Sequence, residues 1–189
     1  MDFDIFTERE AVGAKTEYGI LLGGEATVFI KAGRGGTYRG EGDKYLRFAA
    51  FLREKYGASV ICSGNAEACK SSLEADISVL REYARGGLYL WGTSDGAFKC
   101  TEIACALPFE KMVLVNMPLM INFHKTKARL AALDASRIAF AYGEADPSFK
   151  YVPFLRSLEG AKSITLEKTG HVTACKPEEC ALFARLLFE

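Results

Sequence analysis

Short apolar runs alternate with amphipathic segments along most of the chain. Strands are predicted at 26–32, 58–62, 88–91, 111–116, 137–142 and 162–167, because each is a short run of strand-forming residues that ends in a loop. Helical spacing follows at about 43–56, 66–85, 97–106, 123–133, 151–158 and 177–188. Asp43 is a candidate N-cap, Gly57 a C-terminal stop, and Pro177 fits a first helical turn. Two earlier strands, 3–6 and 15–22, predict an antiparallel hairpin.

Strands that alternate with helices predict an α/β fold with a mostly parallel central sheet and helices on both faces. At 189 residues, we expect one domain, 1–189. Ligands bind at the carboxyl ends of the strands in such sheets. The residues that follow predicted strand ends are Arg34, Ser94, Met117, Asp146 and His171. We therefore expect these five residues to gather at one edge of the sheet.

The segment 88–106 carries the clearest chemistry. It reads as a buried strand, then Gly-Thr-Ser-Asp-Gly at 92–96, then a helix that stops before Pro108. On a tight strand-to-helix turn, the two glycines allow sharp backbone angles, and the Ser94 hydroxyl is pushed out beside the first helical N–H groups. The alternative interpretation is an ordinary turn in which Ser94 caps the helix.

A serine hydroxyl needs a base, and the chain has only two histidines, His124 and His171. His171 follows the last predicted strand, whereas His124 lies near the start of a helix. A base also needs an acceptor that fixes its tautomer. Asp146 follows the preceding strand and comes 25 residues before His171 (171 − 146), with Glu144 as the competing carboxylate. Plain structural roles, such as a turn aspartate before Pro147, are the alternatives.

Composition narrows the classes of partner. Lys and Arg (24) balance Asp and Glu (24), so the charge favours neither nucleic acid nor an anionic membrane surface. The first residues contain no apolar signal core, and no apolar run is long enough to span a bilayer, so we expect a cytoplasmic protein. The six cysteines contain no C-x-x-C pair, so we expect reduced, mostly buried thiols and no metal site.

Three motifs together make nearly the whole chain resemble the α/β-hydrolase fold. They are Gly-Thr-Ser-Asp-Gly at 92–96, Gly-Glu-Ala-Asp-Pro at 143–147, and Thr-Gly-His at 169–171 with a later Pro-Glu-Glu helix start. The resemblance implies that Ser94 is the nucleophile, His171 the general base and acid, and Asp146 the residue that orients it. It also implies an oxyanion hole formed by the N–H of Asp95 and by one from the loop after the third strand, which we assign to Arg34.

Two positions depart from the family pattern. Ala32-Gly33 stands where many members carry His-Gly, and an acid, Asp95, directly follows the nucleophile. A carboxylate is favourable at a helix N-terminus, but aimed at the site it would oppose an oxyanion. We therefore expect Asp95 to point away or to pair with Lys99 or an arginine. Arg34 and Arg39 also have a simpler interpretation as ordinary surface charges.

These observations predict a small serine hydrolase that cleaves a small-molecule ester, thioester or amide without a cofactor. The alternative is a non-catalytic receptor or interaction protein, since fold does not fix function. The segment 117–122 is too short for a lid, so we expect an open cleft walled by Met117, Leu119 and Met120 and a preference for compact acyl groups. The apolar residues Leu119, Met120, Ile121 and Phe123 are a candidate homodimer contact.

Overall fold

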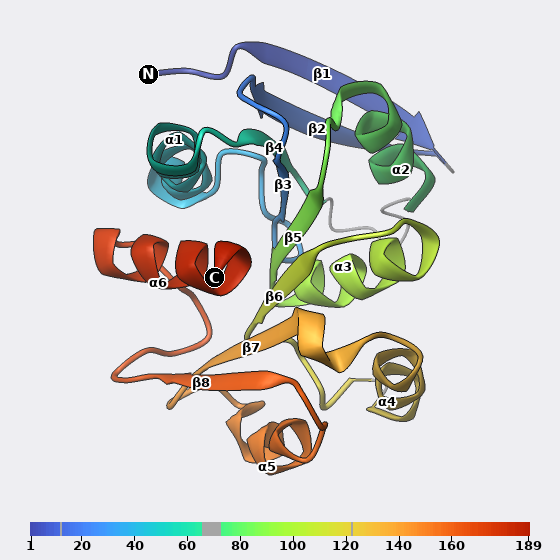
Figure 1. The fold of residues 1–189 in the computed structure, drawn as a ribbon, viewed down its shortest axis with the longest axis vertical. Helices are drawn as coiled ribbons and strands as arrows, with labels where there is room; N and C mark the ends of the chain where they lie inside the picture. The colour runs from blue at the N-terminus through green and yellow to red at the C-terminus, as the bar shows by residue number, and fades with distance from the viewer. Residues whose placement is uncertain (12, 66–72, 122) are drawn as a thin grey trace.

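An eight-stranded sheet forms the centre of the protein, in the order β1-β2-β4-β3-β5-β6-β7-β8 (Figure 1). The structure, a computed structural model, describes residues 1–11, 13–65, 73–121 and 123–189. β2 pairs antiparallel with β1 and β4, and the pairs from β4 to β8 are parallel, which confirms the predicted sheet. The strands are β1 (Ile5–Ala11), β2 (Ala14–Leu21), β3 (Thr27–Lys31), β4 (Ser59–Ser63), β5 (Leu88–Thr93), β6 (Lys111–Val115), β7 (Ile138–Gly143) and β8 (Lys162–Leu166).

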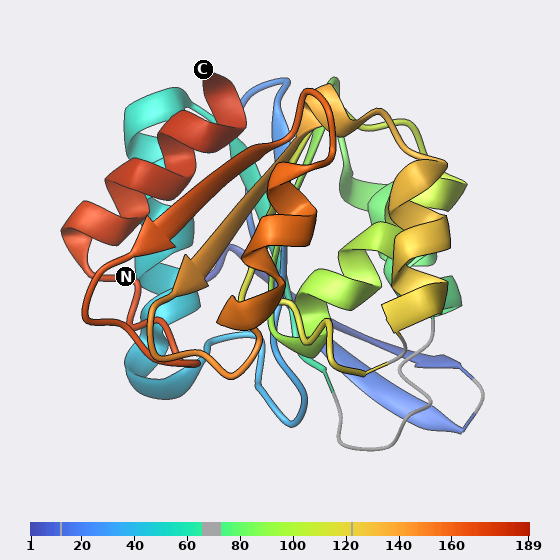
Figure 2. The same ribbon diagram turned by 90° about the horizontal axis from the view of Figure 1, so that it is seen from below.

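Helices cover both faces of this sheet, as predicted (Figure 2). On one face lie α1 (Lys44–Tyr56) and α6 (Pro177–Phe188). On the other face lie α2 (Leu73–Tyr83), α3 (Asp95–Ala106), α4 (Phe123–Ala131) and α5 (Val152–Arg156). No long insertion separates β6 from α4, and the described residues form no lid domain over the carboxyl edge of the strands.

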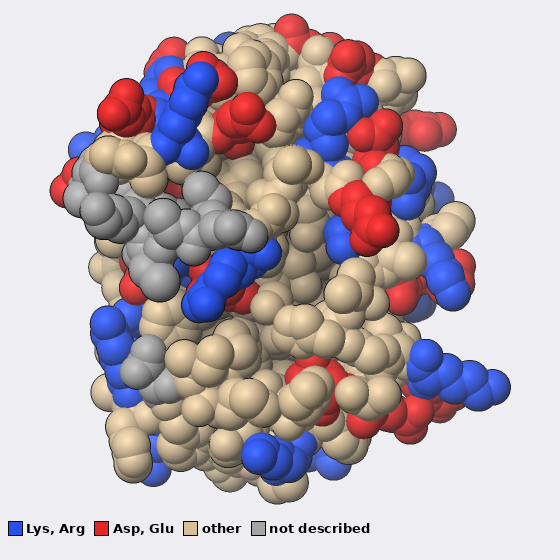
Figure 3. All heavy atoms as spheres, turned by 180° about the vertical axis from the view of Figure 1, so that it is seen from behind, with Lys and Arg blue, Asp and Glu red and all other residues tan. Residues whose placement is uncertain are grey.

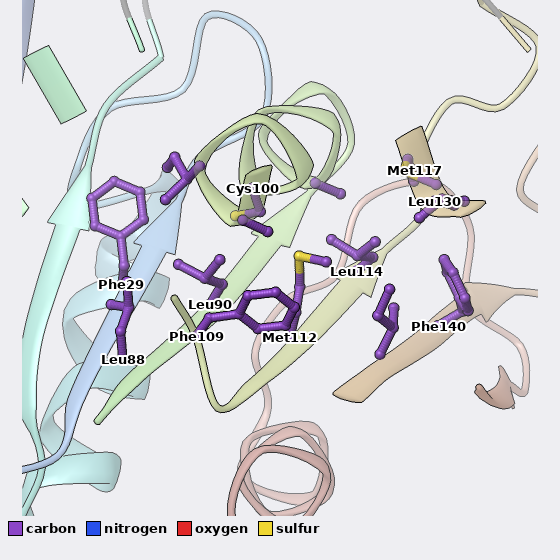
Figure 4. Packing of buried hydrophobic residues seen from close by; sticks show 14 of the residues in the cluster. Phe29, Leu88, Leu90, Cys100, Phe109, Met112, Leu114, Met117, Leu130 and Phe140 are labelled. Atoms are coloured by element: carbon purple, nitrogen blue, oxygen red, sulfur yellow. The ribbon is translucent and has the colours of Figure 1, made fainter. Parts of the chain in front are cut away.

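The central strands alternate their side chains between two apolar cores. Phe29 of β3 packs in the core beneath α2 and α3, whereas Val28 and Ile30 pack in the core beneath α1 and α6. Figure 4 shows part of the first core, between the sheet and α3. In the second core, Trp91 meets the rings of Phe48 and Phe183, each at a centroid distance of 5.5 Å. Strands buried on both faces read as continuous apolar runs, which is why the sequence identifies them.

The structure differs from the sequence prediction at the first strand and at the start of α1. The first strand, predicted at 3–6, is observed at Ile5–Ala11. β1 is an edge strand whose main chain pairs with β2 at polar as well as apolar residues, so the apolar pattern does not mark its extent. Asp43 precedes α1, but its side chain accepts no capping bond and instead pairs with Arg39 at 2.7 Å. The predicted helix 66–85 is observed as Leu73–Tyr83, and its first part, 66–72, lies outside the described residues. Gly57, at φ 65°, ends α1 as predicted.

The surface carries both charge signs. On the face seen in Figure 3, basic and acidic side chains lie near one another rather than in patches of one sign, in keeping with their equal numbers of 24 and 24. In the part of the chain that the structure describes, no helix has the length and apolar character needed to cross a membrane. In the same residues, no group of three or more His, Cys, Asp or Glu side chains is arranged to hold a metal ion.

Candidate active site

Ser94 lies on a sharp turn between β5 and α3. Its backbone has φ 52° and ψ −127°, a strained conformation for a residue with a side chain, and its N–H donates to the carbonyl of Val115 at 2.8 Å. A Cβ atom on Gly96 would lie 2.3 Å from the carbonyl oxygens of Lys31 and Ala32, so only glycine allows α3 to begin this close to β3. Ser94 occupies the N-cap position of α3, but its side chain makes no capping bond, so the interpretation in which the hydroxyl only caps the helix is wrong.

The hydroxyl of Ser94 instead contacts His171, and His171 contacts Asp146. His171 Nε2 lies 2.8 Å from Ser94 Oγ, and His171 Nδ1 lies 2.5 Å from Asp146 Oδ2. The Asp146 side chain is fully buried, whereas 42% of the His171 side chain is exposed. A buried carboxylate on one ring nitrogen and a partly exposed hydroxyl on the other is the arrangement that lets an imidazole accept a proton from serine.

The two competing residues lie elsewhere. Glu144 accepts the backbone N–H of Lys168 at 3.0 Å and therefore stabilises the loop after β8. His124 is exposed on α4, with its ring against Phe123 at 5.9 Å. Asp146 differs from a simple turn residue because its other oxygen, Oδ1, accepts the N–H of Ser148 at 2.6 Å, which fixes the carboxylate toward His171.

Asn116 anchors the loop that carries His171, and the sequence reasoning missed it. It follows β6, is fully buried and has φ 48°, a conformation that asparagine tolerates better than most residues. Its Nδ2 donates to the carbonyls of Gly170 and His171 at 3.0 and 2.8 Å, and its Oδ1 accepts the N–H of Gly143 at 2.9 Å. Its place at the end of the predicted strand 111–116 was the available signal.

The two predicted oxyanion donors border Ser94 from different segments, Arg34 from the loop after β3 and Asp95 from the first turn of α3. A Cβ atom on Gly33 would lie 3.3 Å from the Cβ of Ser94, so the loop after β3, which contains Arg34, packs against the serine. Asp95 is the first residue of α3. Its carboxylate pairs with the Arg34 guanidinium at 3.6 Å and accepts a hydrogen bond from Asn65 at 3.0 Å. Of the two expected partners the arginine is observed, because Lys99 pairs with Glu102 at 3.4 Å.

Two adjoining cavities open onto the serine, and Arg34, Ser94 and His171 line both. One, of about 290 Å³, is lined by the glycine-rich loop 33–36 and by polar residues that include Glu41, Lys44 and Tyr45. Burial raises the pKa of the Tyr45 hydroxyl, which therefore stays neutral. The other cavity, of about 350 Å³, has the more apolar wall, formed by Pro118, Met120, Ile121 and Pro147.

The wall of this second cavity differs from the prediction at two residues. Met120 lines it as expected, but Met117 and Leu119 are buried in the core beneath α3 and α4, as Figure 4 shows for Met117 beside Leu130. Of the predicted homodimer cluster, Met120 and Ile121 are exposed, while Leu119 is buried and Phe123 stacks on Tyr151 at 5.5 Å. The apolar surface near the serine is therefore smaller than the sequence suggests.

The five cysteines that the structure describes do not compete with Ser94 as nucleophiles in this cleft. Cys62, Cys100, Cys175 and Cys180 are buried and Cys105 is exposed, all as free thiols, and Cys69 lies outside the described residues. Burial raises the pKa of the Cys62 and Cys100 thiols, so these two are poor nucleophiles at neutral pH. None of the five described cysteines lines either cavity.

Solved structures of α/β serine hydrolases are similar to this chain over nearly its full length. A serine hydrolase homologue from Coxiella burnetii has a TM-score of 0.74 at 16% identity, with 99% of each chain covered. Est1E from Butyrivibrio proteoclasticus has a TM-score of 0.70 at 10% identity, covering 96% of this chain and 95% of that chain. XC6422 from Xanthomonas campestris, a serine hydrolase without a lid, has a TM-score of 0.65 at 16% identity, covering 97% of this chain and 91% of that chain.

The chain therefore has the α/β-hydrolase fold without a lid, as its three motifs predict. No protein-family model and no curated protein matches it. At 10 to 16% identity these likenesses establish the fold, and the chemistry of the site has to be argued from the residues of this chain.

Proposed function

We propose that this protein is a serine hydrolase that cleaves small esters, thioesters or amides by acyl transfer. The observation that carries the proposal is the continuous chain of hydrogen bonds from Ser94 through His171 to Asp146. Its two contacts, at 2.8 and 2.5 Å, are within the reach needed for proton transfer. The strained turn at Ser94 supports the same proposal, because such strain is typical of a functional position.

In the first half-reaction, Ser94 Oγ bonds to the substrate carbonyl carbon while His171 Nε2 takes the hydroxyl proton. The carbonyl electron pair moves to its oxygen, which the N–H groups of Asp95 and Arg34 bind. Asp146 stabilises the imidazolium that forms and holds its tautomer. When the tetrahedral intermediate collapses, the bond to the leaving group breaks and His171 gives that group its proton. The product of this half-reaction is an acyl-enzyme on Ser94.

In the second half-reaction, water takes the place of the leaving group. His171 removes one proton from the water as its oxygen bonds to the acyl carbon, and the same N–H groups bind the oxyanion again. Collapse breaks the bond to Ser94 Oγ, which recovers its proton from His171, and the carboxylic acid leaves. Both half-reactions use only side chains and backbone groups of this chain.

The cleft favours a compact acyl group. Pro118, Met120 and Ile121 give the second cavity an apolar wall, and 45% of Met120 and 50% of Ile121 are exposed. Such a wall buries one side of a short acyl chain but leaves the end of a long one in water. Hydrophobic stabilisation depends on the area removed from water, so a long chain adds little binding energy here.

A fluorophosphonate probe on the purified protein tests the proposal, because the probe phosphonylates a serine only when a base activates it. The expected result is stoichiometric labelling at Ser94, abolished in Ser94→Ala and unchanged in Ser136→Ala. Ser136 is an exposed serine before β7, at the opposite edge of the sheet, and serves as the matched control. A folded wild-type protein that does not react would contradict the hydrolase and favour the receptor interpretation.

A further inference from the structure

Asn65 is a buried asparagine that touches two segments beside the nucleophile. It follows β4, is 1% exposed, and its Nδ2 donates to both the carbonyl of Ala32 and Oδ2 of Asp95, each at 3.0 Å. Both partners are acceptors, so the amide nitrogen of Asn65 must face them. One side chain therefore connects the end of β3 to the start of α3.

The main chain of Asn65 extends this connection. Its N–H donates to the carbonyl of Gly36 at 2.8 Å, and its carbonyl accepts the N–H of Gly35 at 2.7 Å. Together with the bond to Ala32, Asn65 contacts the loop 32–36 on both sides of Arg34. The loop itself lies against Ser94 at Gly33. The position of the Arg34 N–H relative to the serine therefore depends on Asn65.

The charge of Asp95 gives the contact a second effect. Asp95 follows the nucleophile, and a carboxylate free to turn toward the reacting carbonyl would oppose the negative charge that develops there. Asn65 Nδ2 bonds one oxygen of this carboxylate and the Arg34 guanidinium lies 3.6 Å from the other. The Asp95 side chain is only 21% exposed, so water screens it weakly and its orientation matters.

We propose that Asn65 is a positioning residue for the oxyanion hole. It sets the spacing of the Arg34 N–H, in the loop after β3, from the Asp95 N–H, in the first turn of α3, and it holds the Asp95 carboxylate in place. The inference rests on the proposed hydrolase function and adds to it a residue that does not touch the substrate. Because an oxyanion hole acts on the transition state, the loss of Asn65 should lower kcat and leave KM nearly unchanged.

The main test compares Asn65→Ala and the isosteric Asn65→Asp, which cannot donate either hydrogen bond, with Ser59→Ala as the control. Ser59 lies at the other end of β4, and its hydroxyl likewise joins a loop, accepting from Gly23 N–H at 2.9 Å and donating to Gly24 O at 3.1 Å. Removal of one oxyanion donor costs about 10²–10³ in kcat, and displaced donors should cost about 10–100-fold. With p-nitrophenyl acetate we expect that loss in both Asn65 variants, KM within about twofold, and kcat unchanged in Ser59→Ala.

The affinities for two matched inhibitors distinguish a positioning role in the oxyanion hole from a merely structural role. A trifluoromethyl ketone forms a tetrahedral oxyanion with an active serine, whereas the corresponding methyl ketone binds mainly as a ground-state mimic. We expect the Asn65 variants to lose about 10–100-fold in affinity for the first and little for the second. Equal losses for both ketones, or a kcat equal to that of Ser59→Ala, would overturn the inference.

Amide hydrogen exchange separates this inference from the proposed function. Measured in a Ser94→Ala background, exchange of the amides at 34–36 and 95 should speed up in Asn65→Ala but not in Ser59→Ala. Failure of the wild type to react with a fluorophosphonate would refute the hydrolase. Unchanged exchange in Asn65→Ala would refute the positioning role, whether or not Ser94 is reactive.

Discussion

The Asp146→Asn substitution tests the proposed site most directly. The Asp146 carboxylate accepts the Ser148 N–H on Oδ1 and faces His171 Nδ1 with Oδ2. An asparagine has a single acceptor oxygen. If that oxygen keeps the bond from Ser148, the amide NH₂ faces Nδ1 and forces the tautomer that carries its proton on Nε2. That tautomer cannot take the proton of Ser94, since Nε2 is the atom 2.8 Å from the hydroxyl.

The expected loss is about 10⁴ in kcat, as for other enzymes in which this tautomer is forced. At 1.36 kcal/mol per factor of ten, that is about 5.4 kcal/mol of transition-state stabilisation. The substitution is isosteric, so unfolding in urea should change by only about 1–3 kcal/mol, the cost of one poorly satisfied buried group. Hydrolysis of p-nitrophenyl acetate measures the first quantity and urea titration the second.

The matched control is Glu144→Gln. Glu144 is exposed and accepts one backbone N–H from Lys168, a bond that a glutamine oxygen retains. Its kcat should stay within about twofold of wild type. A folded Asp146→Asn protein that keeps a tenth or more of the activity would refute the reasoning, as would equal losses in the two variants.

Three further predictions follow from other parts of the structure. His171→Ala should lower kcat by at least about 10³ while His124→Ala, an exposed change on α4, should have little effect; equal losses would contradict the assignment of the base. Asp76→Ala should lower the free energy of unfolding in urea by about 3–5 kcal/mol, because it leaves the fully buried Lys31 ammonium without the carboxylate 2.8 Å away. The Lys31→Met, Asp76→Leu double variant removes both charges and should recover most of the loss. Full burial of one methylene supplies about 0.8 kcal/mol, which is roughly fourfold in kcat/KM. Along p-nitrophenyl esters of increasing chain length, kcat/KM should rise by less than this factor per methylene. A steep rise in the monomer would contradict the open cleft.

The reliable part of the sequence prediction is the part that burial dictates. Strands such as β3 and β4 are buried at all five positions, and with one exception their residues are apolar or carry only a small hydroxyl group. Lys31 is that exception: its ammonium ends β3 inside the core, bonded to Asp76 and Ser63. A buried ion pair cannot be recognised from the hydrophobic pattern of the sequence. Its two partners lie far apart in the chain, and each charged residue taken alone is expected at the surface.

The prediction of the cleft wall failed for a different reason. A position after a strand end predicts the edge of the sheet on which a residue lies, but it does not predict the direction of the side chain. The backbone of Met117 lies at the carboxyl edge of the sheet, as predicted, and its carbonyl accepts a hydrogen bond from the Tyr142 hydroxyl at 2.8 Å. Its side chain turns into the core next to Leu130, as Figure 4 shows. Only the packing of β7 and α4 around it determines that direction.

Sheet order explains why one half of the site could be predicted and the other could not. From β5 to β8 the order in the sheet follows the order in the chain, so Ser94, Asn116, Asp146 and His171 leave neighbouring strands in succession. On the other side, β3 lies between β4 and β5, and the direction of winding reverses between β3 and β5. Ligands bind where the winding reverses in open α/β sheets, because the loops there diverge to opposite faces and leave a crevice. Arg34 and Ser94 leave the two strands beside that point, so the proposed oxyanion donors have to come from separate segments. A residue such as Asn65, which arrives from β4 and joins those segments, becomes visible only once the strand order is known.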